Sequence, residues 1–492
     1  MSPALRGPPS SGPSGHLLPA GEKRARHVAV VDIGKTNAKL ALVDLETLAE
    51  RAMRRVPNTV LRSGPYPHYD TETLWAFILG GLGEFARDHE IDAISVTTHG
   101  VAAALLDEAG ELALPVLDYE DDGCASVAAE YDALRPPFAE TGTPRLPVGL
   151  NLGAQIFWQA KAFPGSFARV RHIVPYPQYW AWRLTGVLST EVTSLGCHTD
   201  LWNPGLRDYS SLVDGMGWRP LMPPLRRASE RVGPILPMIA ARTGLDPATP
   251  VCCGIHDSNA SLLPHLLSRA APFSVVSTGT WVVAMVVGAS ARALDSARDT
   301  LVNVDAFGAP VPSARFMGGR EFAILVGGGA VAASDADIAA VLARPVLVMP
   351  SVERGSGPFP GRVAEWLPAE PEAQGMRVAA ASFYLAMMTA TCLDLVGAEG
   401  DTILEGPFAA NAMFTRMLAT ATGRPVAVSA GSTGTSIGAA LLASGDPPAA
   451  IAPAAIARVE PAAEWQAYPE RWRAATNRPP PFADASTSRV RP

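Results

Sequence analysis

Cysteine is scarce in this chain, and its cysteines follow no metal-binding pattern. The five cysteines are Cys124, Cys197, Cys252, Cys253 and Cys392. They show no C-x-x-C spacing and no pairing with histidines at the distances typical of zinc sites. Scattered thiols of this kind are typical of reduced, buried cysteines in a cytosolic protein. The sequence therefore argues against a zinc site and against a disulfide scaffold.

Positive charge is also in short supply. Charged residues make up 18% of the chain, and the net charge is −7 with no basic stripe along any segment. Proteins that bind nucleic acids present a concentrated basic surface to the phosphate backbone. Nucleic acid is therefore not an expected partner.

A long, uninterrupted apolar run is absent as well. The longest apolar stretch, 378–396, contains Ser382, Thr389, Thr391 and Asp394, so it predicts a buried core helix instead of a membrane span. Residues 1–26 do not have the order of a secretory signal, because their basic cluster follows the short apolar piece. We expect a soluble, cytoplasmic protein with no membrane partner.

The chain does have enough apolar residues for more than one core. Hydrophobic residues make up 48% of its 492 residues, and a chain of this length normally divides into two or three domains. We expect a disordered leader over 1–26, an N-terminal lobe over 27–253 and a C-terminal lobe over 254–450. A partly disordered C-terminal extension is expected over 451–492.

Strand-like and helix-like segments alternate through both halves. Expected strands cover 27–31, 39–43, 93–97, 102–106, 273–277, 281–287, 401–404 and 426–429. Expected helices cover 70–90, 376–396, 409–422 and 437–444. Alternation of this kind is typical of the α/β class.

Near the N-terminus, the sequence DIGKTNAK predicts a hairpin with a polar turn. The apolar run 27–31 shows no in/out alternation, which indicates an interior strand. Asp32 stands at the mouth of the hairpin, and the turn at 34–37 offers backbone N–H groups that suit anionic oxygens. A P-loop is excluded, because Ala29 stands where that motif needs glycine and no helix follows. Taken alone, Asp32 could equally be an ordinary turn carboxylate.

The middle of the chain combines a lone carboxylate with a second turn of this kind. Asp257 follows an apolar strand and opens a helix of small residues, and a hydroxyl- and glycine-rich turn follows at 277–280. Phosphoryl transfer needs a base for the acceptor hydroxyl and a cradle for phosphate oxygens. The pattern at 431–438 does not match the dinucleotide spacing G-x-G-x-x-G, so alone it is a helix-entry loop.

The order of these pieces resembles the FGGY family of carbohydrate kinases over roughly 27–445. The stretch from Ala168 to Gly186, which ends in Arg-Leu-Thr-Gly, is also similar to a family segment. The resemblance implies two actin/hexokinase-like lobes of the ribonuclease H-like type around an interlobe cleft. It also implies a small-molecule sugar as acceptor, ATP as co-substrate and Mg²⁺ as cofactor, and it leaves room for a homodimer.

The resemblance also implies roles for individual residues. Asp257 resembles the general base that contacts the sugar, and Asp32 the residue that orients Mg²⁺. The residues implied in ATP binding are Gly34, Lys35, Thr36, Asn37, Lys39, Ser277, Thr278, Gly279, Thr280, Gly406, Asn411, Gly434 and Ser436. The residues implied in sugar binding are His99, Tyr119, Glu120 and Asp121. The alternatives are a purely structural His99 and a solvated acidic loop at 118–122.

Some positions depart from the family pattern. Lys35-Thr-Asn, Glu405-Gly-Pro-Phe, Gln178 and the segment 318–322 all differ from the residues common in the family. The hairpin motif at 32–39 and the helix-entry motif at 256–261 look most like those of rhamnulokinases and fuculokinases. This similarity implies a 6-deoxy-ketohexose phosphorylated on O1. Four aromatic residues are expected either to form an apolar wall for the methyl group of this sugar or only to pack the core. They are Trp158, Tyr176, Tyr179 and Trp180.

Three other functions stay open at this point. One is a kinase for another sugar or polyol, such as ribulose, xylulose, erythritol or glycerol. Another is a non-catalytic sugar-sensing member of the fold. The third is a chaperone-like nucleotide hydrolase, although nothing after residue 450 resembles a peptide-binding domain.

Overall fold

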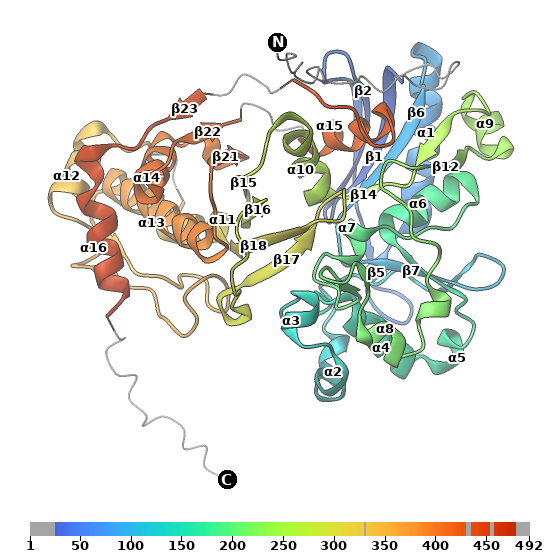
Figure 1. The fold of residues 1–492 in the computed structure, drawn as a ribbon, viewed down its shortest axis with the longest axis horizontal. Helices are drawn as coiled ribbons and strands as arrows, with labels where there is room; N and C mark the ends of the chain where they lie inside the picture. Colours follow the sequence, from blue (N-terminus) through green and yellow to red (C-terminus); the bar gives the residue numbers. More distant parts are fainter. Residues whose placement is uncertain (1–24, 329–330, 430–433, 453–456, 479–492) are drawn as a thin grey trace, which may run out of the picture.

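The computed structural model describes residues 25–328, 331–429, 434–452 and 457–478. Two lobes stand side by side in it, each built on a seven-stranded sheet with helices around it (Figure 1). The α/β class expected from the sequence is therefore confirmed. The leader expected before residue 25 and the tail after residue 478 lie outside the described residues.

The first lobe is organised around β1. The strand order is β12-β13-β6-β1-β2-β3, with β14 also paired to β6. The strands are β1 (His27–Ile33), β2 (Asn37–Asp44), β3 (Ala49–Pro57), β6 (Ala93–Thr98), β12 (Arg231–Pro234), β13 (Pro250–Cys252) and β14 (Ile255–His256). β1 runs antiparallel to β2 and parallel to β6. Residues 28–31 are at most 1% exposed, as expected for a strand covered on both faces.

Strand β3 is one that the sequence pattern did not reveal. Its sequence, AERAMRRVP, is largely exposed and rich in arginine, so it carries no strong apolar signal. The strand forms because β2 offers it a long antiparallel partner at the edge of the sheet. Charged side chains on an edge strand also discourage pairing with other molecules.

Helix α1 (Thr71–Asp88) covers one face of this sheet. Its N-terminus is capped by Asp70, whose side chain accepts a hydrogen bond from the backbone N–H of Thr73 at 3.0 Å. Gly81 lets the helix approach the sheet closely, since a Cβ there would press on the side chain of Leu40. The other helices in this core are α6 (Tyr176–Thr185) and α9 (Pro237–Thr243).

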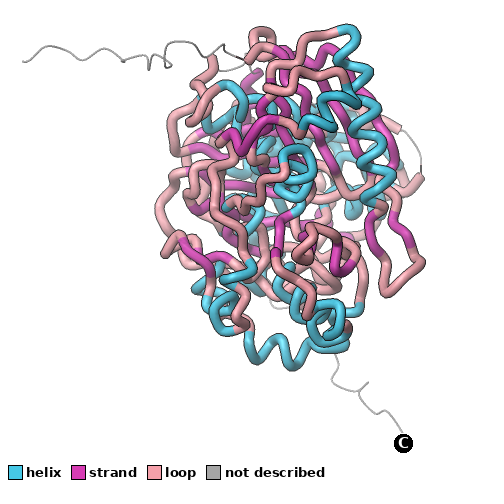
Figure 2. Tube along the Cα trace, turned by 90° about the vertical axis from the view of Figure 1, so that its right-hand side faces the viewer, coloured by secondary structure: helices cyan, strands magenta, loops and turns pink. Residues whose placement is uncertain are grey.

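A largely helical insertion fills the rest of the first lobe. Its helices α2, α3, α4, α5 and α8 lie at the lower end of this lobe in Figure 1, and Figure 2 shows mostly helices and loops there. The elements are β4 (Val60–Leu61), β5 (His68–Tyr69), β7 (Ala103–Leu106), β8 (Leu112–Leu114), η1 (Gly123–Val127), α2 (Ala128–Leu134), α3 (Phe138–Thr141), α4 (Leu152–Ala162), α5 (Pro164–Phe167), β9 (His172–Pro175), α7 (Val192–Leu195), β10 (Trp202–Asn203), β11 (Asp208–Tyr209), α8 (Ser211–Gly215) and η2 (Arg219–Leu221). Most of these elements contribute side chains to a separate apolar core.

The second lobe repeats the mixed-sheet plan. Its strand order is β17-β18-β16-β15-β21-β22-β23, with β15, β21 and β22 parallel to one another. The strands are β15 (Phe273–Thr278), β16 (Val282–Val287), β17 (Thr300–Val304), β18 (Pro310–Phe316), β21 (Asp401–Glu405), β22 (Val426–Val428) and β23 (Ala457–Val459). The remaining elements are η3 (Ser296–Arg298), α11 (Gly318–Val326), α12 (Asp335–Ala343), β19 (Leu347–Val348), β20 (Trp366–Leu367), η4 (Pro407–Ala410), α14 (Ala412–Thr422), η5 (Leu442–Ser444), η6 (Ala463–Trp465) and α16 (Ala467–Thr476).

Helix α13 (Gln374–Leu395) forms the centre of the second core. By length and composition it is the one helix among the described residues that could cross a membrane, but 83% of its apolar window is buried inside the lobe. Phe383, Tyr384 and Met387 are fully buried on it. The core helix predicted for 376–396 is therefore confirmed.

Two helices, α10 (Asp257–Ser268) and α15 (Gly434–Leu441), lie between the two sheets (Figure 1). They pack so closely that a Cβ on Gly438 would overlap the carbonyl oxygen of Ala260. Side chains from both helices share one apolar cluster with β1 and β2, while Leu262 of α10 packs with the second sheet. Helix α10, which begins with Asp257, therefore packs against both lobes.

The sheets do not divide the chain quite where the sequence suggested. β14 still belongs to the first sheet, although it lies beyond the expected boundary at residue 253. β23 joins the second sheet, and α16 anchors there through Tyr468 and Trp472, whose side chains donate to the carbonyls of Val346 and Val348. Over these residues, the expected C-terminal extension is part of the second lobe.

Candidate active site

The carboxyl ends of three parallel strands meet at one edge of the first sheet. Asp32 in β1 lies level with the last residues of β6, and β14 ends at the same level beside them. His99 follows β6 directly, and Asp257 follows β14. Open α/β sheets bind ligands outside the carboxyl ends of their strands. Three residues from distant parts of the sequence therefore converge on one binding edge.

Asp257 lies at this edge as a partly exposed carboxylate. Its Oδ1 lies 3.1 Å from Nε2 of His256 and accepts the backbone N–H of Ser258 at 2.6 Å. Burial raises the pKa of the Asp257 carboxyl, but the adjacent His256, together with His99 and the N–H of Ser258, outweighs burial and holds that pKa below its usual range. The side chain is 31% exposed. An ionised carboxylate with this access can take a proton from a bound hydroxyl.

Asp32 differs from Asp257 in its electrostatic surroundings. Burial raises the pKa of Asp32 to about 6; Lys39 opposes this effect, while the negative charge of Asp257 reinforces it. The Nζ of Lys39 lies 3.8 Å from Asp32 Oδ2 and 3.0 Å from Glu50 Oε1. Lys39 is therefore shared between two carboxylates, and Asp32 is only partly neutralised. A carboxylate in this state is suited to a cation that arrives with the substrate.

The described residues contain no cluster of three or more His, Cys, Asp or Glu side chains able to hold a metal ion. Mg²⁺ commonly binds through one or two carboxylates together with substrate phosphates and water, so a single carboxylate can hold it. Asp32 fits that role, since its carboxylate faces the ammonium of Lys39, which is also shared with Glu50. The residues present therefore fit the magnesium implied by the sequence.

The first predicted phosphate turn is a tight hairpin turn. The N–H of Gly34 donates to the carbonyl of Asn37 at 2.9 Å. Asn58 stabilises the turn from outside the hairpin. Its Nδ2 donates to the carbonyl oxygen of Gly34, and its backbone N–H donates to the carbonyl oxygen of Thr36, both at 2.9 Å. Thr36 and Asn37 are exposed. Sequence reasoning missed Asn58, because it stands in no motif and acts through a contact outside the hairpin.

The second predicted phosphate turn lies at the end of β15: Ser277 and Thr278 are the last residues of that strand, and Gly279 and Thr280 lead on to β16. The N–H of Gly279 donates to the carbonyl of Trp281 at 2.9 Å. The start of α11 packs directly on this turn, because a Cβ on Gly319 would overlap the carbonyl of Gly279. The glycine pair at 318–319, which departs from the family pattern, therefore has a packing role beside the turn.

Thr278 connects this turn to the loop after β21. Its hydroxyl donates to the carbonyl of Glu405 at 2.6 Å and accepts the N–H of Phe408 at 3.1 Å. Gly406 lies against the same residue, with φ of +86° and no room for a Cβ beside the carbonyl of Thr278. The predicted adenosine loop and the predicted phosphate turn are thus directly connected.

Gly406→Ala is therefore expected to raise KM for ATP by about tenfold, equivalent to about 1.4 kcal/mol, because the new methyl group pushes the loop away from Thr278. Gly423→Ala is the matched control, since Gly423 also has a positive φ of +66° but open space around it. The control should lower stability by about 1–2 kcal/mol through backbone strain alone. Steady-state kinetics and thermal melts test both variants, and an equal KM for ATP in the two would contradict this reasoning.

The other predicted adenosine residues differ in their surroundings. Asn411 caps α14: its side chain accepts a backbone N–H of that helix at 3.0 Å and donates to Ser382 at 2.9 Å. Gly434 begins α15, and the hydroxyl of Ser436 is buried without a partner among the described residues. Residues 431–433 of this loop lie outside the described residues. The amide of Asn411 therefore already has a structural use.

His99, which was predicted to contact the sugar, lies among aromatic rings. Its ring centre is 5.4 Å from that of Tyr119 and 5.0 Å from that of Tyr69. Its Nδ1 is 2.9 Å from the carbonyl oxygen of Gly100, whereas its Nε2 is buried without a partner. Burial lowers the pKa of His99 to about 4. The neutral ring therefore presents an unused nitrogen.

The acidic segment contributes a residue that sequence reasoning missed. Asp121 turns back to accept the N–H of Gly123 at 2.8 Å, and the side chain of Glu120 is 67% exposed. Asp118 is the buried member, and it pairs with Lys35. Lys35 was expected beside the phosphates of ATP, but its ammonium lies by Asp118 and the rings of Tyr69 and Tyr119.

The aromatic segment mostly packs the core. Trp158, Tyr179 and Trp180 are at most 8% exposed and belong to the apolar clusters of the first lobe. Tyr176 is also buried, and its ring centre lies 5.3 Å from that of His99. Of this segment, Tyr176 is the residue whose ring lies beside His99, together with the rings of Tyr69 and Tyr119. An apolar wall for a methyl group stays a prediction.

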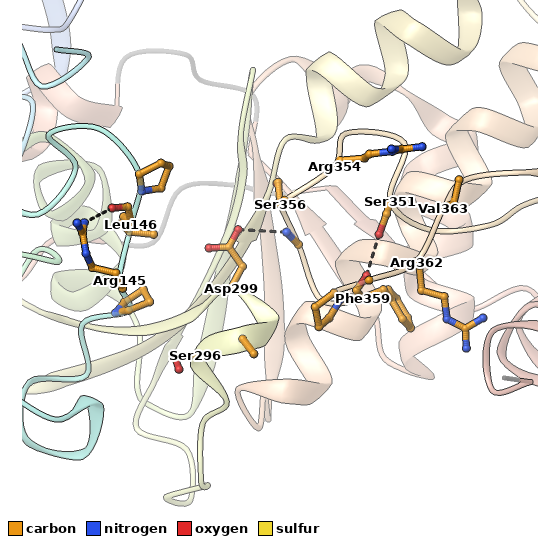
Figure 3. Close-up of a pocket in the computed structure, with 17 residues that line it drawn as sticks. Arg145, Leu146, Ser296, Asp299, Ser351, Arg354, Ser356, Phe359, Arg362 and Val363 are labelled. Atoms are coloured by element: carbon orange, nitrogen blue, oxygen red, sulfur yellow. Dashed lines mark hydrogen bonds between the residues drawn. The ribbon is translucent and has the colours of Figure 1, made fainter. Parts of the chain in front are cut away.

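A cavity of about 540 Å³ lies between the two lobes. Arg145 and Leu146 line it from the first lobe, and Asp299 and the loop at 351–363 line it from the second (Figure 3). Asp299 accepts the N–H of Gly357 at 3.1 Å, which fixes one wall. None of the residues predicted to bind sugar, nucleotide or metal lines this cavity, so it is separate from the candidate active site.

Two family models match the chain. The model described as FGGY family of carbohydrate kinases, N-terminal domain, matches residues 27–264. The model described as Carbohydrate kinase FGGY, C-terminal domain, matches residues 270–452. The resemblance stated from the sequence is confirmed by both matches.

Individual relatives support the same grouping. The crystal structure of a carbohydrate kinase from Novosphingobium aromaticivorans is 38% identical, with a TM-score of 0.85 over 91% of this chain and 100% of that chain. The rhamnulokinase of Enterobacter sp. (strain 638) is 28% identical over 38% of this chain and 41% of that protein. The L-fuculokinase of Escherichia coli (strain K12) is 25% identical over 53% of this chain and 56% of that protein. The chain thus spans about half the length of these two curated relatives. The family matches and the similar crystal structure confirm the expected two-lobed fold.

Proposed function

Because the chain belongs to the FGGY family of carbohydrate kinases and is therefore a sugar kinase that uses ATP, we propose that it phosphorylates O1 of a 6-deoxy-ketohexose. The preferred substrate is L-rhamnulose, followed by L-fuculose. The observation that carries the proposed chemistry is Asp257, a partly exposed carboxylate whose pKa is held low at the shared edge of Asp32 and His99. The names of the two curated relatives, a rhamnulokinase and an L-fuculokinase, support this choice of sugar.

The reaction needs one proton acceptor and an in-line displacement. The acceptor hydroxyl gives its proton to the Asp257 carboxylate as its oxygen bonds to the γ-phosphorus of ATP. The bond between that phosphorus and the β,γ-bridging oxygen breaks, and ADP leaves with that oxygen. Because little covalent chemistry falls to the protein, positioning and charge stabilisation supply most of the acceleration.

The two turns and Asp32 supply that positioning in the proposal. The backbone N–H groups of the turns at 34–37 and 277–280 hold the β- and γ-phosphates, and the loop around Gly406 continues toward the adenosine. Asp32 would hold Mg²⁺ together with the phosphates, with Lys39 balancing the charge. Mg²⁺, when bound, neutralises negative charge on the transferred group.

The sugar preference is tested by kcat/KM across a panel of acceptors. We expect L-rhamnulose and L-fuculose to exceed L-ribulose, D-xylulose, erythritol and glycerol. The margin should be roughly 10–200-fold, because a single methyl group in an apolar pocket contributes about 1–3 kcal/mol. A preference for glycerol or for a pentulose would contradict the proposed sugar while leaving the kinase family untouched.

We also propose the cytoplasm as the location of the enzyme. All five cysteines are free and buried, which suits a reducing compartment. A homodimer stays a prediction from the sequence.

A further inference from the structure

The side chain of Lys35 leaves the first phosphate turn and enters the sugar side of the lobe. Its Nζ pairs with Oδ1 of Asp118 and lies 3.4 Å from Oε2 of Glu120. Only 17% of the Lys35 side chain and 6% of the Asp118 side chain are exposed. Withdrawing an ammonium from such a partly buried pair leaves the carboxylate uncompensated. The Lys35 ammonium is therefore poorly placed to leave Asp118 and bind a phosphate of the nucleotide.

Two aromatic rings flank the Lys35 ammonium. Nζ lies 5.3 Å from the ring centre of Tyr69 and 5.1 Å from that of Tyr119. The same two rings flank His99, at 5.0 Å and 5.4 Å between centres. Lys35 and His99 thus share one aromatic enclosure. A few convergent polar groups among aromatic walls are the usual makeup of a small-molecule site.

His99 supplies an acceptor that the protein does not use. Its Nδ1 faces the carbonyl of Gly100 at 2.9 Å, and Nδ1 must carry the proton because a carbonyl can only accept. Nε2 therefore keeps its lone pair. His99 is 5% exposed, and Nε2 has no partner among the described residues. A buried acceptor without a donor is costly, so this nitrogen points to a ligand hydroxyl.

Asp118 supplies a second acceptor. Its Oδ1 takes the hydrogen bonds of the described residues: from Lys35, from the hydroxyl of Tyr69 at 3.3 Å and from the N–H of Glu120 at 3.2 Å. Oδ2 accepts no hydrogen bond from the part of the chain that the structure describes, so it can accept one from a ligand. Lys35, Asp118 and His99 together therefore offer a cationic donor and two acceptors within one enclosure.

We propose that the Lys35–Asp118 pair, beside His99, recognises neighbouring hydroxyls of a neutral sugar. One hydroxyl accepts from Lys35 Nζ and donates to Asp118 Oδ2, and a second hydroxyl donates to His99 Nε2. The charge of Lys35 is outweighed by those of Asp118 and Glu120, so the site disfavours sugar acids through like-charge repulsion. The inference rests on the proposed function, since it names the residues that select the sugar of that kinase.

The test compares binding of sugar and nucleotide separately, by titration calorimetry on the full-length chain. L-rhamnulose, L-fuculose and L-ribulose are titrated without nucleotide, and Mg·ADP is titrated without sugar. Lys35→Met should raise Kd by roughly 10- to 100-fold for each sugar that binds the wild type. Its Kd for Mg·ADP should stay unchanged. D-gluconate should bind the wild type more weakly than any of the three ketoses that bind.

Two further variants protect the test against misfolding and nonspecific effects. The double variant Lys35→Met/Asp118→Leu removes both charges, so no buried carboxylate is left unpaired, and it should lose sugar affinity while keeping a wild-type thermal melt. Lys39→Met is the matched control on the same hairpin, because Lys39 contacts Asp32 and not the sugar side. It should leave sugar affinity intact.

Wild-type sugar affinity in both Lys35 variants would overturn the inference, as would a loss of Mg·ADP affinity in place of sugar affinity. If the wild type phosphorylates a sugar while those variants bind it normally, the Lys35 assignment alone fails. If the wild type shows no sugar-dependent turnover, the proposed function fails, and the Lys35 assignment fails with it.

Discussion

Asp257→Asn is expected to lower kcat by roughly 10²–10⁴-fold while the fold and the affinity for ATP stay intact. The asparagine keeps the size of the carboxylate, so the start of α10 and its contact with His256 persist. It cannot take the proton of the acceptor hydroxyl, because its amide is not basic. Steady-state rates, calorimetry with ATP and a thermal melt measure the three quantities.

Asp122→Asn is a suitable control for this variant, because Asp122 is exposed and lies outside the candidate site. The control should keep wild-type kcat. The pKa of Asp257 is held below its usual range, so the base should stay ionised across the neutral range and impose no loss of rate there. Near-wild-type turnover in Asp257→Asn would place the base elsewhere.

Asp32→Ala is expected to lower kcat/KM for Mg·ATP by roughly 10²–10³-fold, the effect typical of losing one electrostatic partner of a transition state. Sugar affinity should change little, because Asp32 contacts Lys39 and not the sugar-side residues. Rates measured against Mg²⁺ concentration, with sugar binding as the control, separate the two effects. An unchanged Mg²⁺ requirement in the variant would remove Asp32 from the metal site.

The same residue predicts a pH dependence in the wild type. Burial raises the pKa of Asp32 to about 6, so the carboxylate is charged above that pH and becomes neutral as the pH falls through it. The Mg²⁺ concentration needed for half-maximal rate should therefore rise by roughly tenfold for each pH unit below about 6. A half-maximal Mg²⁺ concentration that stays constant between pH values on either side of 6 would contradict this role.

Elements with a strong local pattern were predictable from the sequence. The hairpin of β1 and β2 combines an apolar run with a glycine-containing turn, and α13 has a long apolar composition, so both follow from short-range physics. β3 was not predictable, because its arginine-rich sequence becomes a strand only when β2 offers a partner. The C-terminal helix α16 was missed for a similar reason: its anchors, Tyr468 and Trp472, act through contacts with a distant segment.

The same limit applies to the candidate site. Asp257 and Asp32 follow buried strands, so the sequence could indicate that both lie at the edge of a sheet. The Lys35–Asp118 pair joins residues 83 positions apart, and no spacing rule connects them. Asn411 shows the opposite problem, because an asparagine that caps a helix has the same sequence signature as one that contacts a ligand.

ADP release from Mg·ATP, measured with and without L-rhamnulose or another sugar of the panel, tests sugar-dependent phosphoryl transfer most directly. We expect negligible release without sugar, and release with sugar that matches the appearance of a phosphomonoester in the ³¹P spectrum. Equal release with and without sugar would indicate a nucleotide hydrolase, and sugar binding without release would indicate a sensor. Either result would contradict the assignment of this chain as an active sugar kinase.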